Sequence, residues 1–307
     1  INKNKKELKI MKIFDCFMYF DEDLVLDVRL NFLDKFVDKF VIIESEYNHK
    51  GEKRTPLFNI NKFERFKHKI QYILVNKIPL GIEKINIDED KNELYRKSIF
   101  NAWKRENLQR NQISKGLLDA NEEDWIIISD LDEIPDLSQL NLKNINDSFV
   151  FFKQDMMYYK FNLKLEDFIW VGSKACKMKN LESPQWIRDI KNNKYQWWRL
   201  DTYFSKKKYR NIFFVENGGW HFSYLKSPKD IEKKLQSYLH HIDYDLNPVG
   251  EKGIEKMINN KRTIYNLKAD QREKKFDGAN KLIKININSL PSYIMENKNK
   301  LKDWIEE

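Results

Sequence analysis

The sequence predicts an α/β protein with a mainly parallel central sheet. Two observations support this prediction. Short apolar runs alternate with segments of helical spacing over the first half of the chain, as in parallel strands joined by helices. An acidic segment, 129–135, also follows directly on one of these runs, at the position where open α/β sheets bind their ligands.

The strands and helices follow from the spacing of the apolar residues. Continuous apolar runs indicate buried strands, whereas apolar residues three or four positions apart indicate a helix. A helix is expected at 24–36, and 92–118 has the length of one long helix or two adjoining ones that end near Gly116. Strands are expected at 12–19, 40–44, 70–75, 125–129, 149–152 and 156–161.

The second half of the chain is less regular. Beyond about residue 165 no clear period is visible, and tryptophans are frequent between positions 170 and 220. Such a density suits a ligand-binding face, although a core role for half of these tryptophans fits as well. From residue 227 the sequence becomes basic, and helices are expected at 229–241, 251–260 and 291–304.

The composition limits the classes of partner. With 307 residues the chain can bury a sizeable core, and its net charge of +9 favours anionic partners such as nucleic acid, phospholipid head groups, nucleoside diphosphates or acidic glycans. The basic residues are spread over many lysine-rich stretches, so a lysine-rich surface is the simpler interpretation. Peripheral contact with an anionic membrane is compatible with this charge.

Cysteine usage and hydropathy bear on the location. Cys16 and Cys176 are too few for a disulfide framework and lack the spacing of a zinc site. No apolar run approaches the ~20 residues that a transmembrane helix needs. We therefore expect a cytoplasmic location. The sequence contains no dinucleotide-binding glycine motif, no Walker loop, no nucleophile elbow and no zinc-protease motif.

The most informative motif is the acidic segment Ser-Asp-Leu-Asp-Glu-Ile-Pro at 129–135. Alternate residues of an extended segment point the same way, so Asp130 and Asp132 should lie side by side. Their mutual repulsion would be relieved by Mg²⁺ or Mn²⁺, which proteins bind with one or two carboxylates plus substrate phosphates. The alternative is an acidic turn that caps the next helix. The apolar strand before the motif and Pro135 after it favour the metal site.

Two further segments contain candidate ligands. In the stretch 105–112, Arg105 or Arg110 could reach phosphates or orient the acidic segment, with Gln109 beside them. An ion pair between Glu106 and Arg110 on a solvated helix face is the simpler interpretation of that stretch alone.

The segment 218–224 combines two glycines with an aromatic-flanked histidine. The glycines, Gly218 and Gly219, let the backbone approach a neighbour closely. His221 is either a packed core residue or a third metal ligand that completes the pair of aspartates.

Taken in order, these segments resemble the family 17 glycosyltransferases. The matching stretches are 13–17 followed by Glu22 and Arg29, then 38–44, 105–110, 129–135 and 219–224, and they span roughly 12–245. The resemblance implies a GT-A-like α/β fold, a nucleotide-sugar donor that is UDP-linked, inversion at the anomeric carbon and a divalent metal. It implies transfer of GlcNAc or a related hexose to a glycan acceptor, with Asp130 and Asp132 at the metal and the diphosphate.

The resemblance also suggests a division of the chain. We expect a catalytic domain at 1–245, with a donor half at about 11–145 and an acceptor half at about 146–245. A basic helical C-terminal extension would then occupy 246–307.

The remaining site residues are assigned by their place in these halves. The residues expected to bind the donor are Asp15, Glu44, Arg105, Gln109, Arg110, Asp130 and Asp132. Trp186 and Trp220 are expected at the acceptor. The candidates for the catalytic base are Asp155, Asp189, Glu216 and Glu133, the last of which could instead support the metal segment.

Two other classes of function remain open. The same acidic cluster could serve a metal-dependent hydrolase or phosphodiesterase, which would release free sugar or phosphate without an acceptor. A basic nucleic-acid-binding protein is supported by the charge alone and would bind any polyanion with a steep salt dependence. We expect no nucleic-acid partner, and the oligomeric state does not follow from the sequence.

Overall fold

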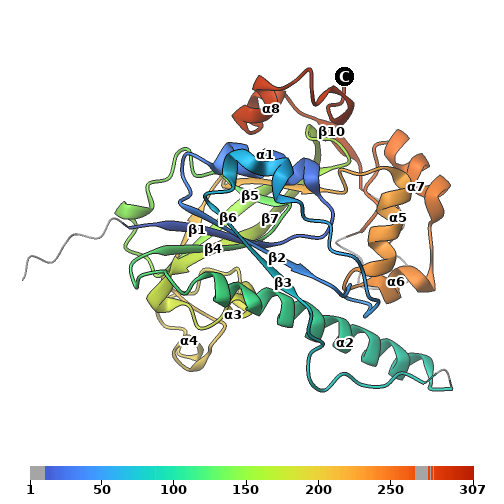
Figure 1. Ribbon diagram of the computed structural model, residues 1–307, viewed down its shortest axis with the longest axis horizontal. Coiled ribbons are helices and arrows are strands. Elements are labelled where there is room, and N and C mark those ends of the chain that lie inside the picture. The colour runs from blue at the N-terminus through green and yellow to red at the C-terminus, as the bar shows by residue number, and fades with distance from the viewer. Residues whose placement is uncertain (1–10, 87, 267–275, 277, 279) are drawn as a thin grey trace, which may run out of the picture.

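The computed structural model describes residues 11–86, 88–266, 276, 278 and 280–307. Within them, ten strands form one mixed sheet whose main path runs β3-β2-β1-β4-β7-β6-β9-β5, with β10 and β8 added at β7 and β6 (Figure 1). The strands are β1 (Ile13–Met18), β2 (Lys39–Ser45), β3 (Ile70–Val75), β4 (Trp125–Asp130), β5 (Glu133–Pro135), β6 (Phe149–Tyr158), β7 (Leu163–Lys177), β8 (Ile212–Val215), β9 (Gly219–Ser223) and β10 (Leu282–Lys284).

The sheet is parallel in its first half only. β3, β2, β1 and β4 are parallel neighbours, as predicted. β7 then pairs antiparallel with both β4 and β6. The prediction of a mainly parallel sheet therefore holds for residues up to 130; beyond them the sheet is mixed, with β6 parallel to β8 and β9 and β7 antiparallel to β4, β6 and β10. The reason is the short connection between β6 and β7, because strands joined by a tight turn must run in opposite directions.

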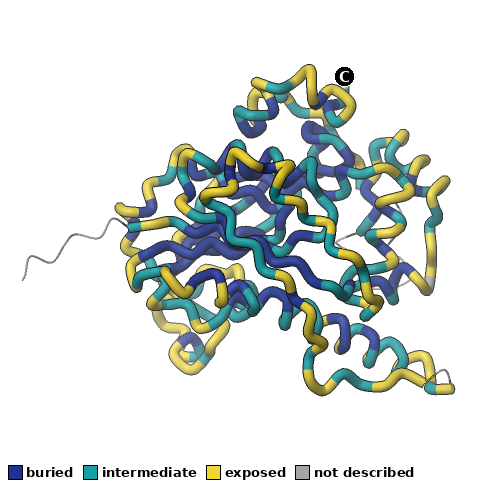
Figure 2. Tube along the Cα trace, in the orientation of Figure 1, coloured by how far each residue is buried: buried dark blue, intermediate teal, exposed yellow. Residues whose placement is uncertain are grey.

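Helices cover both faces of the sheet. α1 (Asp23–Leu33) and α8 (Ser292–Glu296) lie on one face, and α2 (Lys91–Asn111) and α3 (Pro184–Asp189) lie on the other (Figure 1). Alternate residues of the central strands enter the two layers: Phe17 and Ile127 pack with α1, whereas Cys16 and Ile128 belong to the opposite cluster. Burial on both faces explains why these strands are continuous apolar runs, and Figure 2 shows them as the buried centre.

A third apolar cluster joins the end of the β6–β7 hairpin to a group of helices. These are α5 (Pro228–Ser237), α6 (His241–Leu246) and α7 (Gly250–Asn259). Ile231 and Leu235 of α5 and Ile254 of α7 are fully buried against Tyr158 and Tyr159. The helical group therefore forms one wall beside the ends of the strands.

The last residues return to the sheet. β10 pairs with β7, and the chain then crosses above α1, where Leu290, Ile294 and Leu301 join the core of that face. In place of the single helix expected at 291–304, α8 is followed by a short 3₁₀ turn at Lys302–Trp304. In the described part of the chain, no helix is both long and apolar enough to cross a membrane.

Candidate functional site

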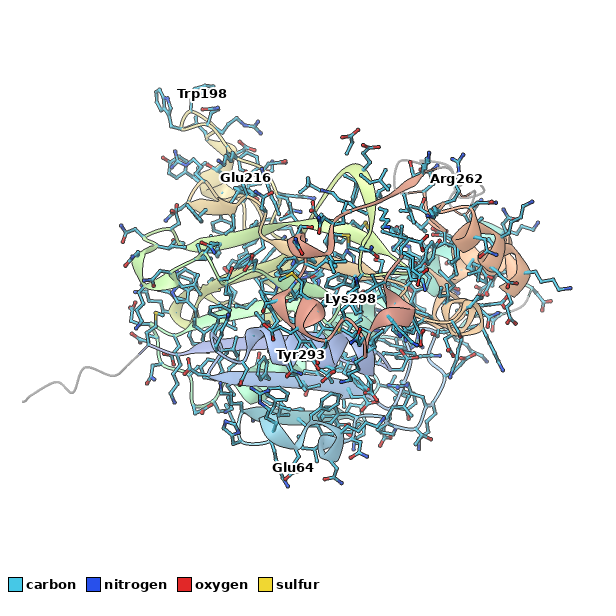
Figure 3. All side chains as sticks on the ribbon, turned by 90° about the horizontal axis from the view of Figure 1, so that it is seen from above. Glu64, Trp198, Glu216, Arg262, Tyr293 and Lys298 are labelled. Atoms are coloured by element: carbon cyan, nitrogen blue, oxygen red, sulfur yellow. The ribbon has the colours of Figure 1, made fainter. Side chains whose placement is uncertain are left out.

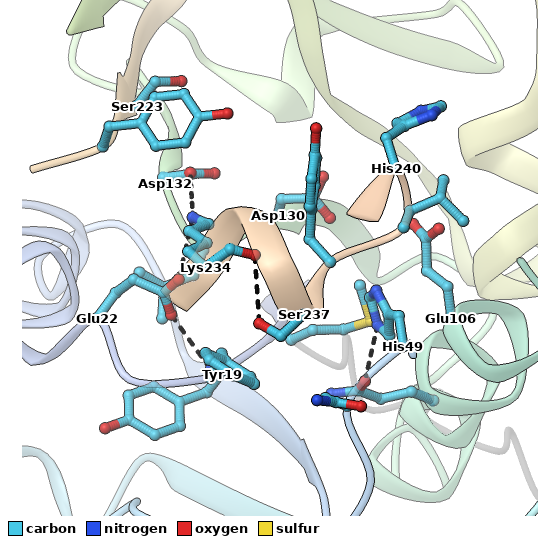
Figure 4. Close-up of a pocket in the computed structure, with 18 of the residues that line it drawn as sticks. Tyr19, Glu22, His49, Glu106, Asp130, Asp132, Ser223, Lys234, Ser237 and His240 are labelled. Carbon is cyan, nitrogen blue, oxygen red and sulfur yellow. Dashed lines mark hydrogen bonds and ion pairs between the residues drawn. The ribbon is translucent and has the colours of Figure 1, made fainter. Parts of the chain in front are cut away.

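A cavity of about 470 Å³ opens where the carboxyl ends of β1, β2 and β4 meet α2, α5 and the residues 238–240 that follow α5. Its volume lies in the range typical of small-molecule sites. Open α/β sheets bind ligands at this edge, so the position agrees with the sequence prediction. Polar groups and tyrosines both line the cavity, and Figure 4 draws 18 of the lining residues. The tyrosines are Tyr19, Tyr47, Tyr158, Tyr224, Tyr238 and Tyr265.

The two aspartates of the acidic motif both line this cavity. Asp130 is the last residue of β4 and accepts from Arg110 at 2.9 Å and from Arg188 at 3.1 Å. Asp132 lies two residues further on, 3.4 Å from Nε2 of His221 and 3.6 Å from Nζ of Lys234. The predicted pair of neighbouring carboxylates is therefore present, and each carboxylate is held by protein cations.

Both carboxylates are ionised at neutral pH. Burial opposes ionisation of Asp130, yet the charges of Arg188 and Arg110 lower its pKa to about 2. Burial also opposes ionisation of Asp132, but His221 and Lys234 hold its pKa well below the usual range. The pKa of His221 is raised in turn: burial lowers it, and the Asp132 carboxylate more than offsets that effect.

A buried guanidinium fixes the backbone of the acidic segment. Arg29 of α1 is fully buried and donates to the main-chain oxygens of Asp130, Leu131 and Glu133 at 3.2, 3.0 and 2.7 Å. Its other nitrogens form a bidentate pair with Asp15 at 2.6 and 2.7 Å. A planar guanidinium supplies five donors in fixed directions, so one side chain sets the path of three carbonyls.

Glu133 also holds the acidic segment 129–135 in place. It is fully buried, accepts from the backbone nitrogen of Asp130 at 2.8 Å and from Trp170 at 2.7 Å, and pairs with Arg188 at 2.6 Å. It does not line the cavity. This placement agrees with the supporting role that we considered for Glu133 and not with its use as a base.

Lys234 enters the site from α5 and belongs to none of the motifs that the sequence analysis selected. It lies 3.2 Å from Glu22 as well as close to Asp132, and all three side chains line the cavity (Figure 4). The pKa of Lys234 is raised, because Glu22 and Asp132 together outweigh the effect of burial. Its charge therefore persists at neutral pH.

We use the name acid network for a set of nine side chains. They form two ion-paired groups that adjoin at Asp130 and Asp132: Glu22, Lys234, Asp132 and His221 in one, and Glu106, Arg110, Asp130, Arg188 and Glu133 in the other. This set contains five carboxylates and three permanent cations. Even with His221 protonated, its net charge stays negative.

Only some of the residues predicted to bind the donor line the cavity. Gln109 lines the cavity, and Arg110 lies behind Asp130 and orients it. Arg105 instead donates to the backbone oxygen of His49 and does not line the cavity. Asp15 and Glu44 are fully buried and are also absent from the lining.

Asp15 and Glu44 serve other parts of the fold. Asp15 is paired with Arg29. Glu44 accepts from the backbone nitrogens of Leu57 and Phe58, and it pairs with Arg54. Their predicted contact with a nucleoside is thus not supported by their placement, because the end of a buried strand can point its last carboxylate into the protein as well as out of it.

The predicted bases lie away from the cavity. Asp155, Asp189 and Glu216 form ion pairs with Lys164, Lys207 and Lys153, and none of the three lines it. The carboxylates that do line it, besides the two aspartates, are Glu22 and Glu106. Sequence reasoning missed both as bases, although Glu22 lies in the matching N-terminal stretch.

The two tryptophans predicted at the acceptor also lie elsewhere. Trp220 is 8% exposed, packs against Phe32 and donates to the backbone oxygen of Ser289. Trp186 packs beside Phe149 at the opposite end of β6. Trp170, another of the tryptophans between 170 and 220 expected on a ligand-binding face, does line the cavity.

The paired glycines have the predicted role of close backbone approach. Gly219 has a φ of 123°, and a Cβ there would lie 2.1 Å from the backbone oxygen of Ile134. β9 can therefore pair tightly with β5, which places His221 opposite Glu133 and next to Asp132. Nδ1 of His221 is buried and has no hydrogen-bond partner in the described structure.

The donor set partly fits a divalent metal. No group of three or more His, Cys, Asp or Glu side chains within the described ranges is arranged to hold an ion. Two carboxylates nevertheless suffice for Mg²⁺ or Mn²⁺ when substrate phosphates complete the coordination. The negative charge of the acid network also leaves a diphosphate short of compensating positive charge. Asp130 and Asp132 are the side chains that would hold the ion.

The fold and the site define an α/β protein with a polar cavity at the carboxyl edge of its sheet. The chain matches the family model for glycosyltransferase family 17 over residues 2–304 and belongs to this family.

Curated relatives agree with this membership. The chain is 25% identical over 228 residues to the β-1,4-mannosyl-glycoprotein 4-β-N-acetylglucosaminyltransferases of Mus musculus and Homo sapiens. Each alignment covers 69% of this chain and 40% of the relative. The chain thus spans well under half the length of the relatives that it matches.

Proposed function

We propose that this glycosyltransferase moves GlcNAc or a related hexose from a UDP-linked donor to a hydroxyl group of a glycan, with inversion at the anomeric carbon. The observation that carries the proposal is the placement of Asp130 and Asp132 together in the cavity at the carboxyl edge of the sheet. Membership of family 17 supports a nucleotide sugar as the ligand at this edge. The sugar and the acceptor follow by analogy with the named relatives.

The reaction is a direct displacement. The acceptor oxygen forms a bond to the anomeric carbon while the bond from that carbon to the diphosphate oxygen breaks, and the electron pair leaves with UDP. The acceptor proton passes to a carboxylate that reaches the cavity. Glu22 and Glu106 are the proposed bases, since the three candidates from the acceptor half lie outside it.

The diphosphate leaving group brings more negative charge into a site whose charged side chains are already net negative. A diphosphate adds negative charge beside five carboxylates, and the three cations of the acid network are already shared among them. Mn²⁺ or Mg²⁺ bound with the donor would supply the missing positive charge and stabilise the departing diphosphate. Lys234 would share in this task because its amine lies within the cavity.

The proposal is tested by thermal denaturation with nucleoside diphosphates. UDP should raise the melting temperature, and it should raise it further with Mn²⁺, because a ligand that binds the folded state more tightly stabilises it more. GDP, CDP and ADP serve as matched controls. Stabilisation by all four without metal dependence would contradict a UDP–metal site.

A second measurement separates transfer from hydrolysis. UDP-GlcNAc is incubated with Mn²⁺, with and without a mannose-containing oligosaccharide, and the sugar products are identified. A new glycosidic linkage of inverted configuration is expected. Release of free GlcNAc at the same rate without acceptor would instead indicate a hydrolase.

A further inference from the structure

An exposed segment at the other end of the molecule is rich in both aromatic and basic residues. We call residues 191–211 the aromatic–basic segment; it contains α4 (Asp201–Phe204). Phe204 is 91% exposed, Trp197 76% and Leu200 69%. Trp198 and Tyr203 are also largely exposed, and Figure 3 shows Trp198 at the outer tip of this region. Exposed apolar groups gathered in this way mark an interaction surface.

The base of the segment packs against the rest of the protein, so its exposed tip projects from a fixed position. Tyr209 packs against Phe149 and Trp186, with ring centroids 4.8 and 5.8 Å away. Trp186 of α3 donates to the backbone oxygen of Lys206 at 2.8 Å. The backbone nitrogen of Lys191 donates to the backbone oxygen of Lys207 at 2.8 Å, which closes the loop at its neck.

The segment carries a large excess of positive charge. Among its 21 residues are seven lysines and arginines and a single acidic residue, Asp201. Glu182 and Asp189, from outside the segment, pair with Lys206 and Lys207. The excess remains positive when these two are included. The segment therefore holds much of the chain's net charge of +9 beside a group of strongly exposed apolar side chains.

We infer that the aromatic–basic segment binds the surface of an anionic phospholipid bilayer. Lysines and arginines are attracted to the lipid phosphates, while tryptophan, phenylalanine and leucine insert at the boundary between head groups and acyl chains. A glycan would explain the tryptophans but not Leu200 and Phe204, whose tips offer no hydrogen bonds to sugar hydroxyls. It would also leave the excess of positive charge without a partner.

The proposed membrane surface is distant from the cavity. The segment packs against Phe149 at the start of β6, whereas Met156 and Tyr158 at the end of the same strand line the cavity. A strand rises about 3.3 Å per residue, so roughly 23–30 Å along β6 separates Phe149 from these two residues. Changes in the segment should therefore leave catalysis on a water-soluble acceptor intact.

Vesicle flotation tests this inference on the full chain. Wild-type protein should float with phosphatidylcholine vesicles that contain phosphatidylglycerol and stay behind with pure phosphatidylcholine. The triple variant Trp197→Ser/Trp198→Ser/Phe204→Ser should lose binding at least tenfold. The matched control is Phe100→Ser/Trp103→Ser, which removes exposed aromatic residues from α2. It should bind as the wild type does.

A charge variant tests the electrostatic part separately. Lys191→Gln/Lys194→Gln/Lys206→Gln removes three exposed lysines from the segment, and roughly 100-fold weaker partitioning onto anionic vesicles is expected. Lys252→Gln/Lys256→Gln/Lys284→Gln removes three exposed lysines elsewhere and should have a much smaller effect. Salt should weaken the wild-type interaction, since it screens exposed charges.

Several outcomes would overturn the inference. One is wild-type protein that does not bind anionic vesicles, and another is binding that survives both segment variants. Equal affinity for neutral and anionic vesicles would remove the role of the charge. If the aromatic variant instead abolished concentration-dependent self-association in gel filtration, the segment would be a contact between copies of the chain. Melting temperature with UDP and Mn²⁺, measured for every variant, confirms that the fold and the distant site are intact.

Discussion

The floor and the wall of the cavity are held in different ways. The floor is the acidic segment 129–133, whose backbone is fixed by the buried Arg29 and whose side chains rest on Glu133 and Arg188. The wall is α5, which packs through Ile231 and Leu235. Its charged residue Lys234 faces the cavity, where it meets Glu22 and Asp132.

This difference separates stability from ligand binding. Buried charges that lose a partner destabilise the fold strongly, because the remaining charge cannot be solvated. Ion pairs that border a cavity are partly solvated and contribute little to stability. Substitutions beneath the floor should therefore lower the stability of the fold, and substitutions at the wall should weaken binding of the donor.

The largest expected effect is on transfer by the variant Asp132→Asn. This substitution keeps the size of the side chain and removes the charge that would hold a metal and its diphosphate. Transfer should fall by on the order of 1000-fold, in the range seen when one such group is lost. The melting temperature should change little, since Lys234 keeps its pair with Glu22. Activity near the wild-type level, or activity undiminished by EDTA, would remove Asp132 from the metal site.

The next effect is on stability and concerns Arg29→Met. The variant leaves the Asp15 carboxylate and three carbonyls of the floor without their donor, so the free energy of unfolding should fall by about 3–5 kcal/mol. Urea denaturation measures this change. Arg65→Met, which removes an exposed arginine paired with Asp34, is the control and should change stability by less than about 1 kcal/mol.

A second change distinguishes lost pairing from poor packing. In Arg29→Met/Asp15→Leu the unpaired buried carboxylate is gone, so part of the lost stability should return. A double variant no more stable than Arg29→Met alone would show that the carbonyls or the packing, and not Asp15, dominate the loss.

The floor could be predicted from the sequence because its signals are local. Strands buried on both faces form continuous apolar runs, so 125–129 marks β4 to within a residue, and the aspartates follow directly. β7 could not be predicted: its middle residues Glu166 and Asp167 are exposed, so it shows neither a continuous run nor a clean alternation.

The partners of the floor could not be predicted because they come from distant parts of the chain. Arg188 meets Asp130 across 58 positions, and Lys234 meets Glu22 across 212. No periodicity links such residues. Trp220 was wrongly predicted for a different reason. Its position next to His221 in the sequence suggested a contact with the acceptor, but its ring packs in the core against Phe32.

The third prediction concerns how the free energy of unfolding depends on pH through Lys174, a buried lysine that supports Arg188. Lys174 of β7 is buried and donates to the backbone oxygens of Arg188 and Ile190 at 2.8 and 2.6 Å, so it supports the helix end that carries Arg188. Burial, assisted by the charge of Arg188, lowers the pKa of Lys174 to about 7.

The sign of the effect follows from proton binding. Above pH 7 the folded state has released the Lys174 proton, whereas the unfolded state keeps it up to about pH 10.4. Unfolding therefore takes up a proton in this window, and the wild type gains stability relative to Lys174→Met as the pH rises, by up to about 1.4 kcal/mol per pH unit. Below pH 7 the difference should be constant. Denaturation of both proteins at pH 6, 7, 8 and 9 measures it, and a difference that does not vary would place the Lys174 pKa outside the window.

The smallest expected effect is at the wall, in Lys234→Gln. Loss of this cation should raise the KM for the donor about tenfold, as expected for one charge-assisted contact of ~1.4 kcal/mol, and should lower kcat less. Stability should fall by no more than about 1 kcal/mol, because Glu22 and Asp132 border the cavity and can be solvated. Lys233→Gln, the exposed neighbour on α5, is the matched control and should behave as wild type. A Lys234→Gln enzyme with an unchanged donor KM, or one that unfolds as readily as Arg29→Met, would show that the wall and the floor do not differ in the way that their contacts indicate.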